Sequence, residues 1–102
     1  MNLAIRTLQL AGREGLTARH ADNLLAGGGQ LVDVRSPDDF RRDALPGARN
    51  LPLDALSRDY RYLDKSAVVI LCGTRDAACA RAARLLAGKG FRRIYHLADA
   101  RD

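Results

Sequence analysis

Cys72 is the residue of this chain best placed to act as a nucleophile. It follows an apolar, β-branched run, Ala67 to Leu71, that predicts a buried strand. A short loop comes next, and then an alanine-rich helix whose apolar face consists of Cys79, Ala82, Ala83 and Leu86. The unpaired N–H groups and the dipole at a helix N-terminus favour a thiolate. The sequence therefore predicts that the pKa of Cys72 is lowered and that its thiol is reactive.

A cysteine can also serve only as a small apolar residue, and this alternative applies to both thiols of the chain. Cys79 would offer a partner for an intramolecular disulfide with Cys72, but its position on the apolar helical face favours packing. His96 falls in an apolar segment and is expected to be structural. His20 falls on the surface of a predicted helix.

The composition is that of one ordinary globular domain. The chain has 102 residues, of which 28% are charged and 47% belong to the hydrophobic set. Only two cysteines are present, too few for a disulfide framework or a zinc quartet, so we expect a reducing compartment and a cytoplasmic location. No apolar run approaches the length of a membrane span, and the N-terminal residues do not have the pattern of a signal peptide.

Arginine dominates the positive charge of the chain. Fifteen arginines and two lysines give a net charge of +5. Such an excess fits either a surface that attracts anions or arginines that lie on solvated faces. We expect no nucleic-acid partner, because aromatic residues that would stack on bases do not interleave with the basic ones.

The N-terminal half alternates between helical and extended patterns. Residues 2–12 predict a short amphipathic helix or arm, so we expect residues 1–15 to form an N-terminal arm or short helix. Thr17 is a suitable N-cap for a helix over about residues 18–25, which the triple glycine at 27–29 ends. Residues 31–35 predict a strand that Asp33 interrupts, and a buried carboxylate there would need several donors.

The second half continues the alternation. Ser36 caps a helix that begins at Pro37 and ends at about Arg42. A turn at 45–48, an extended piece at 48–51 and a short helix within 53–63 precede the strand before Cys72, and residues 94–97 predict a last strand. This order predicts an α/β domain with a largely parallel sheet. In such sheets ligands bind at the carboxyl ends of strands, where Cys72 and Arg35 fall.

Several blocks of the chain, in this order and spacing, resemble a rhodanese-like domain of the single-domain sulfurtransferase type. They are residues 31–40, 45–53, 68–72, 82–91 and 94–97. The resemblance covers about residues 16–98, and we assign residues 16–102 to this domain. It implies an α/β fold with a central, mostly parallel sheet that is flanked by helices on both faces.

The resemblance also implies an activity. Cys72 would be the catalytic nucleophile and would carry a persulfide sulfur from a small anionic donor such as thiosulfate to a thiol or cyanide acceptor, or to a protein acceptor. The chemistry needs no metal and no cofactor. Asp33 and Arg35 could bear on catalysis, but as polar residues at the end of a buried strand they are expected to support the site by hydrogen-bonding neighbouring loops. The backbone N–H groups that would cradle the anion belong to Gly73, Thr74, Arg75, Asp76, Ala77 and Ala78.

The loop after Cys72 departs from the pattern of many active members, Cys-x-x-Gly-x-Arg. Glycine follows the cysteine directly, the arginine comes early at Arg75, and Asp76 adds a negative charge. Phosphatases of the same fold need an arginine six positions after the cysteine, where this chain has Ala78. The departure leaves a second function open, a catalytically inactive rhodanese-like binding or regulatory module. The pKa of Cys72 and its loading with sulfur distinguish the two.

Overall fold

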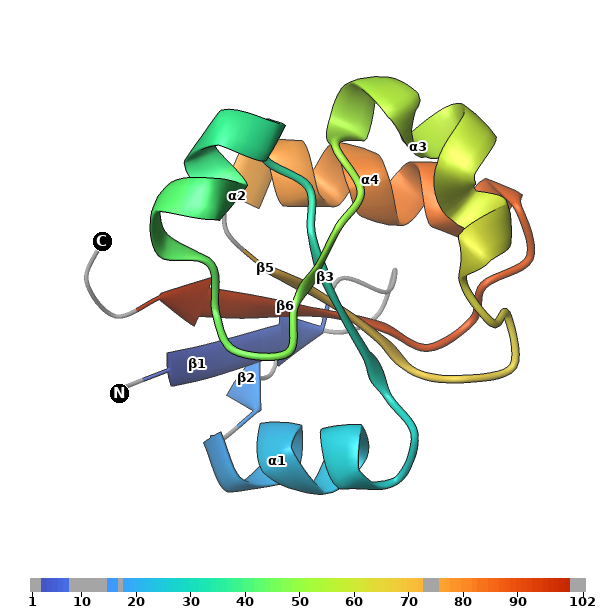
Figure 1. The fold of residues 1–102 in the computed structure, drawn as a ribbon. Helices are drawn as coiled ribbons and strands as arrows, with labels where there is room; N and C mark the ends of the chain where they lie inside the picture. Colours follow the sequence, from blue (N-terminus) through green and yellow to red (C-terminus); the bar gives the residue numbers. More distant parts are fainter. Residues whose placement is uncertain (1–2, 8–14, 17, 73–75, 100–102) are drawn as a thin grey trace.

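The computed structural model describes residues 3–7, 15–16, 18–72 and 76–99. From β2 onward, strands alternate with helices along these residues (Figure 1). In chain order they are β1 (Leu3–Thr7), β2 (Gly15–Leu16), α1 (Ala18–Ala26), β3 (Gln30–Asp33), α2 (Pro37–Asp43), β4 (Arg49–Asn50), α3 (Leu53–Asp59), a 3-10 helix η1 (Tyr60–Tyr62), β5 (Val69–Cys72), α4 (Asp76–Gly88) and β6 (Ile94–Asp99).

The strands form one sheet in the order β2-β1-β6-β5-β3-β4. The pairs β6–β5, β5–β3 and β3–β4 are parallel, whereas β1 pairs antiparallel with both β6 and β2. The central part of the sheet is therefore parallel, which confirms the predicted α/β class. The carboxyl ends of β3 and β5 meet at the same edge, because Asp33 lies in register with Cys72.

The prediction of a helix within residues 2–12 is wrong for residues 3–7, which form β1. Leu3 and Ile5 fit a strand as well as a helix, since two apolar residues that alternate with others satisfy a period of two. The edge of β6 provides the pairing partner, and Ile5 lies in register with Leu97. Pairing with a distant strand, which local periodicity does not reveal, decides the outcome here.

Local signals set the ends of two helices as predicted. Ser36 is the N-cap of α2 and accepts a hydrogen bond from the N–H of Asp39 at 3.3 Å, and Pro37 is the first helical residue. At the end of α1, the N–H of Gly29 donates to the carbonyl of Leu24 at 2.8 Å, and Gly28 has a φ of 104°. Glycine suits that left-handed conformation. The predicted N-cap Thr17 lies outside the described residues.

Helices cover both faces of the sheet, as predicted (Figure 1). Helix α1 packs on one face, where Ala21 joins Leu31, Ile70, Cys72 and Leu97. Helices α3 and α4 pack on the opposite face, where they bury a cluster that includes Val32, Leu56, Val69, Leu71, Cys79, Ala82 and Leu86. Within the described residues, each helix is too short or too polar to cross a membrane.

Candidate active site

Cys72 lies at the carboxyl end of β5, between the ends of two neighbouring strands. Asp33 of β3 flanks it on one side and Leu97 of β6 on the other. Helix α4 begins at Asp76, four residues later in the chain. The order strand, thiol, short connection and helix is the one that the sequence predicts, and it puts Cys72 where open α/β sheets bind their ligands.

The thiol of Cys72 is buried, with 1% of the residue exposed, and it packs in the apolar layer under α1. Burial raises the pKa of Cys72 to about 12; the carboxylate of Asp33 and the thiol of Cys79 add to the rise, and Arg35 opposes it. The predicted lowering of this pKa is therefore wrong. The removal of the thiolate from water and the neighbouring negative charge outweigh the cation.

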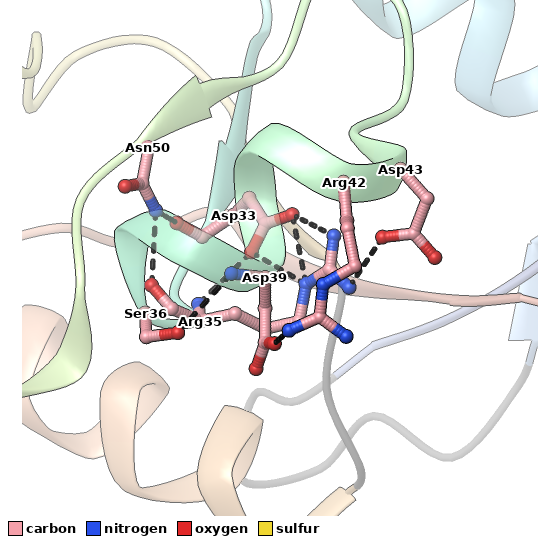
Figure 2. Close-up of polar contacts among 7 residues, drawn as sticks. All are labelled: Asp33, Arg35, Ser36, Asp39, Arg42, Asp43 and Asn50. Atoms are coloured by element: carbon pink, nitrogen blue, oxygen red, sulfur yellow. Dashed lines mark hydrogen bonds and ion pairs between the residues drawn. The ribbon is translucent and has the colours of Figure 1, made fainter.

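Asp33, which lies in register with Cys72, forms a densely bonded polar group with Arg35. Figure 2 shows the bonds between the two side chains. The carboxylate of Asp33, which is 1% exposed, accepts from the backbone N–H of Arg35 at 2.9 Å. It also accepts from Nε of Arg35 at 3.2 Å and from Nη2 at 2.9 Å. Asp33 thus has the several donors that a buried carboxylate requires. Its bonds to Arg35 also raise the pKa of that guanidinium.

Two residues that the sequence did not single out complete this group (Figure 2). Asn50 of β4 donates its side-chain N–H groups to the carbonyl oxygens of Asp33 and Arg35, both at 3.0 Å. Asp43, the last residue of α2, accepts from Nη1 of Arg35 at 2.8 Å. Asn50 is found only through the parallel register of β3 and β4, which no local pattern shows. For Asp43 a signal exists, since a carboxylate at a helix C-terminus is unfavourable and implies a cation nearby.

The predicted anion cradle falls partly outside the described residues. Gly73, Thr74 and Arg75 lie in the part of the chain that the structure does not describe. Asp76, Ala77 and Ala78 form the start of α4, with Ala77 exposed and Ala78 half-buried. The anion cradle therefore remains a prediction. The structure positions only the residues at the start of α4.

The second cysteine and the two histidines lie in the core or on the surface of α1. Cys79 is fully buried on the apolar face of α4, as predicted from its spacing. His96 is buried in β6, and His20 is exposed on α1. Among the described residues, no three or more histidine, cysteine or acidic side chains are arranged to hold a metal ion.

Comparison with known proteins assigns the chain to a family. A family model described as "Rhodanese-like domain" matches residues 17–100. An uncharacterized protein of Bacillus subtilis, YqhL, is 35% identical over 68 residues, which cover 67% of this chain and 54% of that protein. The thiosulfate sulfurtransferase GlpE of Ectopseudomonas mendocina is 29% identical over 82 residues, which cover 80% of this chain and 75% of the relative.

A solved structure agrees with this assignment. The crystal structure of the Alr3790 protein from Anabaena superposes with a TM-score of 0.68 at 25% identity, covering 78% of this chain and 74% of the other. The present chain spans about half of the Bacillus subtilis relative, 54% of its length. Because the family model covers most of the chain and the fold agrees, the chain belongs to the rhodanese-like domain family.

Proposed function

We propose that this chain is a sulfurtransferase in which Cys72 carries sulfane sulfur as a persulfide. The position of Cys72 supports the proposal most strongly, since the thiol lies at the carboxyl end of the central parallel strand β5 and shortly before α4. This is the edge of the sheet at which α/β proteins bind ligands. The similarity to a thiosulfate sulfurtransferase makes thiosulfate the first donor to consider.

The reaction consists of two displacements at sulfur. The thiolate of Cys72 attacks the outer sulfur of thiosulfate, the S–S bond of the donor breaks, and sulfite leaves with the bonding electrons. A nucleophilic acceptor such as cyanide or a thiol then attacks the outer sulfur of the persulfide. The Cys72 thiolate leaves and is ready for the next donor. The N–H groups at the start of α4 would stabilise the negative charge of both sulfur species.

The raised pKa of Cys72 limits this reaction at neutral pH. With a pKa of about 12, roughly one thiol in a hundred thousand is ionised at pH 7. Turnover should therefore be slow near neutrality and increase with pH, until a bound donor or an acceptor protein changes the surroundings of the thiol.

The same burial favours a second function, that of a catalytically inactive binding or regulatory module. A thiol that is 1% exposed and has a raised pKa is a poor nucleophile. In this alternative the rhodanese-like fold presents a surface to a partner, and Cys72 only packs against its apolar neighbours.

Steady-state turnover tests the proposal. Incubation with thiosulfate and cyanide should yield thiocyanate and sulfite in equal amounts. Cys72→Ser should reduce the rate by about a hundredfold or more, because serine forms no persulfide. Cys79→Ala, which removes the other thiol, should retain turnover. Thiocyanate production that survives Cys72→Ser would refute the role of Cys72, and none from the parent protein would favour the binding module.

A further inference from the structure

The two lysines of the chain lie together on its surface. Lys65 belongs to the connection between η1 and β5, and Lys89 directly follows α4. Both are exposed, and their ammonium groups lie beside the same aromatic ring, with Nζ of Lys65 6.0 Å and Nζ of Lys89 5.0 Å from the centroid of Tyr60. The half-buried Tyr60, which packs against the core, therefore holds two positive charges close to each other.

Two arginines extend this positive surface. The connection after η1 and the connection after α4 are neighbours (Figure 1). A Cβ at Gly90 would lie 3.5 Å from Cδ of Lys65, and Nη2 of Arg93 donates to the carbonyl of Ser66. Arg92, the residue before Arg93, is exposed as well. We call the following four residues the basic edge: Lys65, Lys89, Arg92 and Arg93.

The basic edge lies at the opposite end of the parallel strands from Cys72. It surrounds the amino ends of β5 and β6, whose first residues Val69 and Ile94 are in register. Cys72 is the last residue of β5. Because a strand rises about 3.3 Å per residue, about 10 Å of sheet separates Val69 from Cys72. A molecule bound at the basic edge therefore does not need to cover the thiol.

Ion pairs do not offset the charges of the basic edge. Within the described part of the chain, none of its four side chains pairs with a carboxylate. On α2, by contrast, each arginine pairs with an aspartate three residues earlier. Residues 63–68 and 89–93 contain one carboxylate, that of Asp64, which accepts from the N–H and the hydroxyl of Ser66 instead. Like charges that gather without counter-charges repel one another and attract an anionic partner.

We propose that the basic edge is a docking site for an acidic segment of a partner protein, separate from the site of Cys72. Lysine supplies a flexible point charge that suits the carboxylates of such a segment. Binding of RNA or DNA would be helped by an aromatic ring that stacks on bases, but Tyr60 is half-buried and already lies beside both lysines. An acidic protein therefore fits this edge better than a nucleic acid does.

Binding of the intact chain to a fluorescent, glutamate-rich peptide tests the proposal. The double substitution Lys65→Gln and Lys89→Gln should weaken binding about fivefold or more at low ionic strength, and added salt should weaken binding of the parent protein. The matched control is the double substitution Arg41→Gln and Arg42→Gln, which removes the same net charge from exposed positions on α2. This control should change the affinity less than about twofold.

Four results would overturn the proposal. They are no binding by the parent protein, binding that does not respond to salt, an equal loss of affinity in the two double variants, and tighter binding of a single-stranded oligonucleotide of the same charge. The last result would identify a nucleic-acid surface.

Alkylation of Cys72 by iodoacetamide locates the bound peptide. The rate should be the same with and without saturating peptide, because the basic edge and the thiol lie at opposite ends of β5. Protection of Cys72 by the peptide would contradict a separate docking site. The proposed function is tested independently, since thiosulfate turnover can fail while the peptide still binds at the basic edge.

Discussion

At the scale of single residues, Cys72 combines the position of a nucleophile with the surroundings of a core residue. The position could be predicted from the sequence, because an apolar run before the thiol and a helix after it specify the end of a strand. The burial could not be predicted, since it depends on Ala21, Leu31 and Leu97, which come from three other elements. Nor could the proximity of Asp33, which the parallel register of β3 and β5 creates.

The reactivity of Cys72 should increase over an unusually wide range of pH. Because only the thiolate reacts and its pKa is raised to about 12, the iodoacetamide rate at Cys72 should rise about tenfold per pH unit from pH 7 to 10. The urea-unfolded chain is the control, and its rate should level off above about pH 8.5. A native-state rate that levels off by pH 9 would contradict the raised pKa.

The group around Arg35 divides into a part that could be predicted and a part that could not. Asp33 in an apolar strand implied several donors, and Arg35 supplies them. The side chains of Asn50 and Asp43 became part of the group only in three dimensions, because β4 pairs beside β3 and because α2 ends next to Arg35. Sequence reasoning thus identified the buried charge but not the two residues that fix its cation.

At the scale of elements, the ends of helices were predicted better than the antiparallel strand β1. The cap of α2 depends on residues within one turn, Ser36 to Asp39, and the structure has it as predicted. Strand β1 depends on pairing with β6, some ninety residues later in the chain, as in the register of Leu3 with Asp99. Local patterns specify the first kind of feature, while tertiary pairing decides the second.

Two glycines, Gly29 in the turn after α1 and Gly88 at the end of α4, should respond oppositely to alanine. A Cβ at Gly29 would lie 2.7 Å from the carbonyl oxygen of Leu24, a backbone atom that cannot move without shifting the end of α1. Gly29→Ala should therefore lower the free energy of unfolding by about 1–3 kcal/mol. At Gly88 in α4 a Cβ would meet no atom within 4 Å. Gly88→Ala should therefore raise the free energy of unfolding by about 0.5–1 kcal/mol.

Urea denaturation of the parent and the two glycine variants tests this contrast. Both substitutions add the same methyl group, at Gly29 between the end of α1 and the start of β3 and at Gly88 as the last residue of α4, and only the first brings it against a backbone atom. Equal urea midpoints for Gly29→Ala and Gly88→Ala would show that the close approach at Gly29 does not affect stability.

At the scale of the whole molecule, the alternation of strands and helices determines where chemistry can occur. Parallel strands β3, β5 and β6 bring Asp33, Cys72 and Leu97 to one edge, although these residues are far apart in the chain. The α/β class followed from the order of the strand and helix patterns, while the helical layers on both faces were implied by the resemblance to rhodanese-like domains. Whether the thiol at that edge is used for catalysis depends on its protonation, which the packing of the molecule controls.

The central claim is that Cys72 accepts sulfane sulfur, and intact-mass spectrometry after incubation with thiosulfate tests it most directly. The account predicts that the parent protein gains the mass of one sulfur atom, faster at pH 9 than at pH 7, and that peptide mapping assigns the atom to Cys72. Cyanide should remove it, and Cys72→Ser should gain nothing. A parent protein that stays unmodified at both pH values, with thiosulfate and with an organic persulfide as donor, would contradict the account.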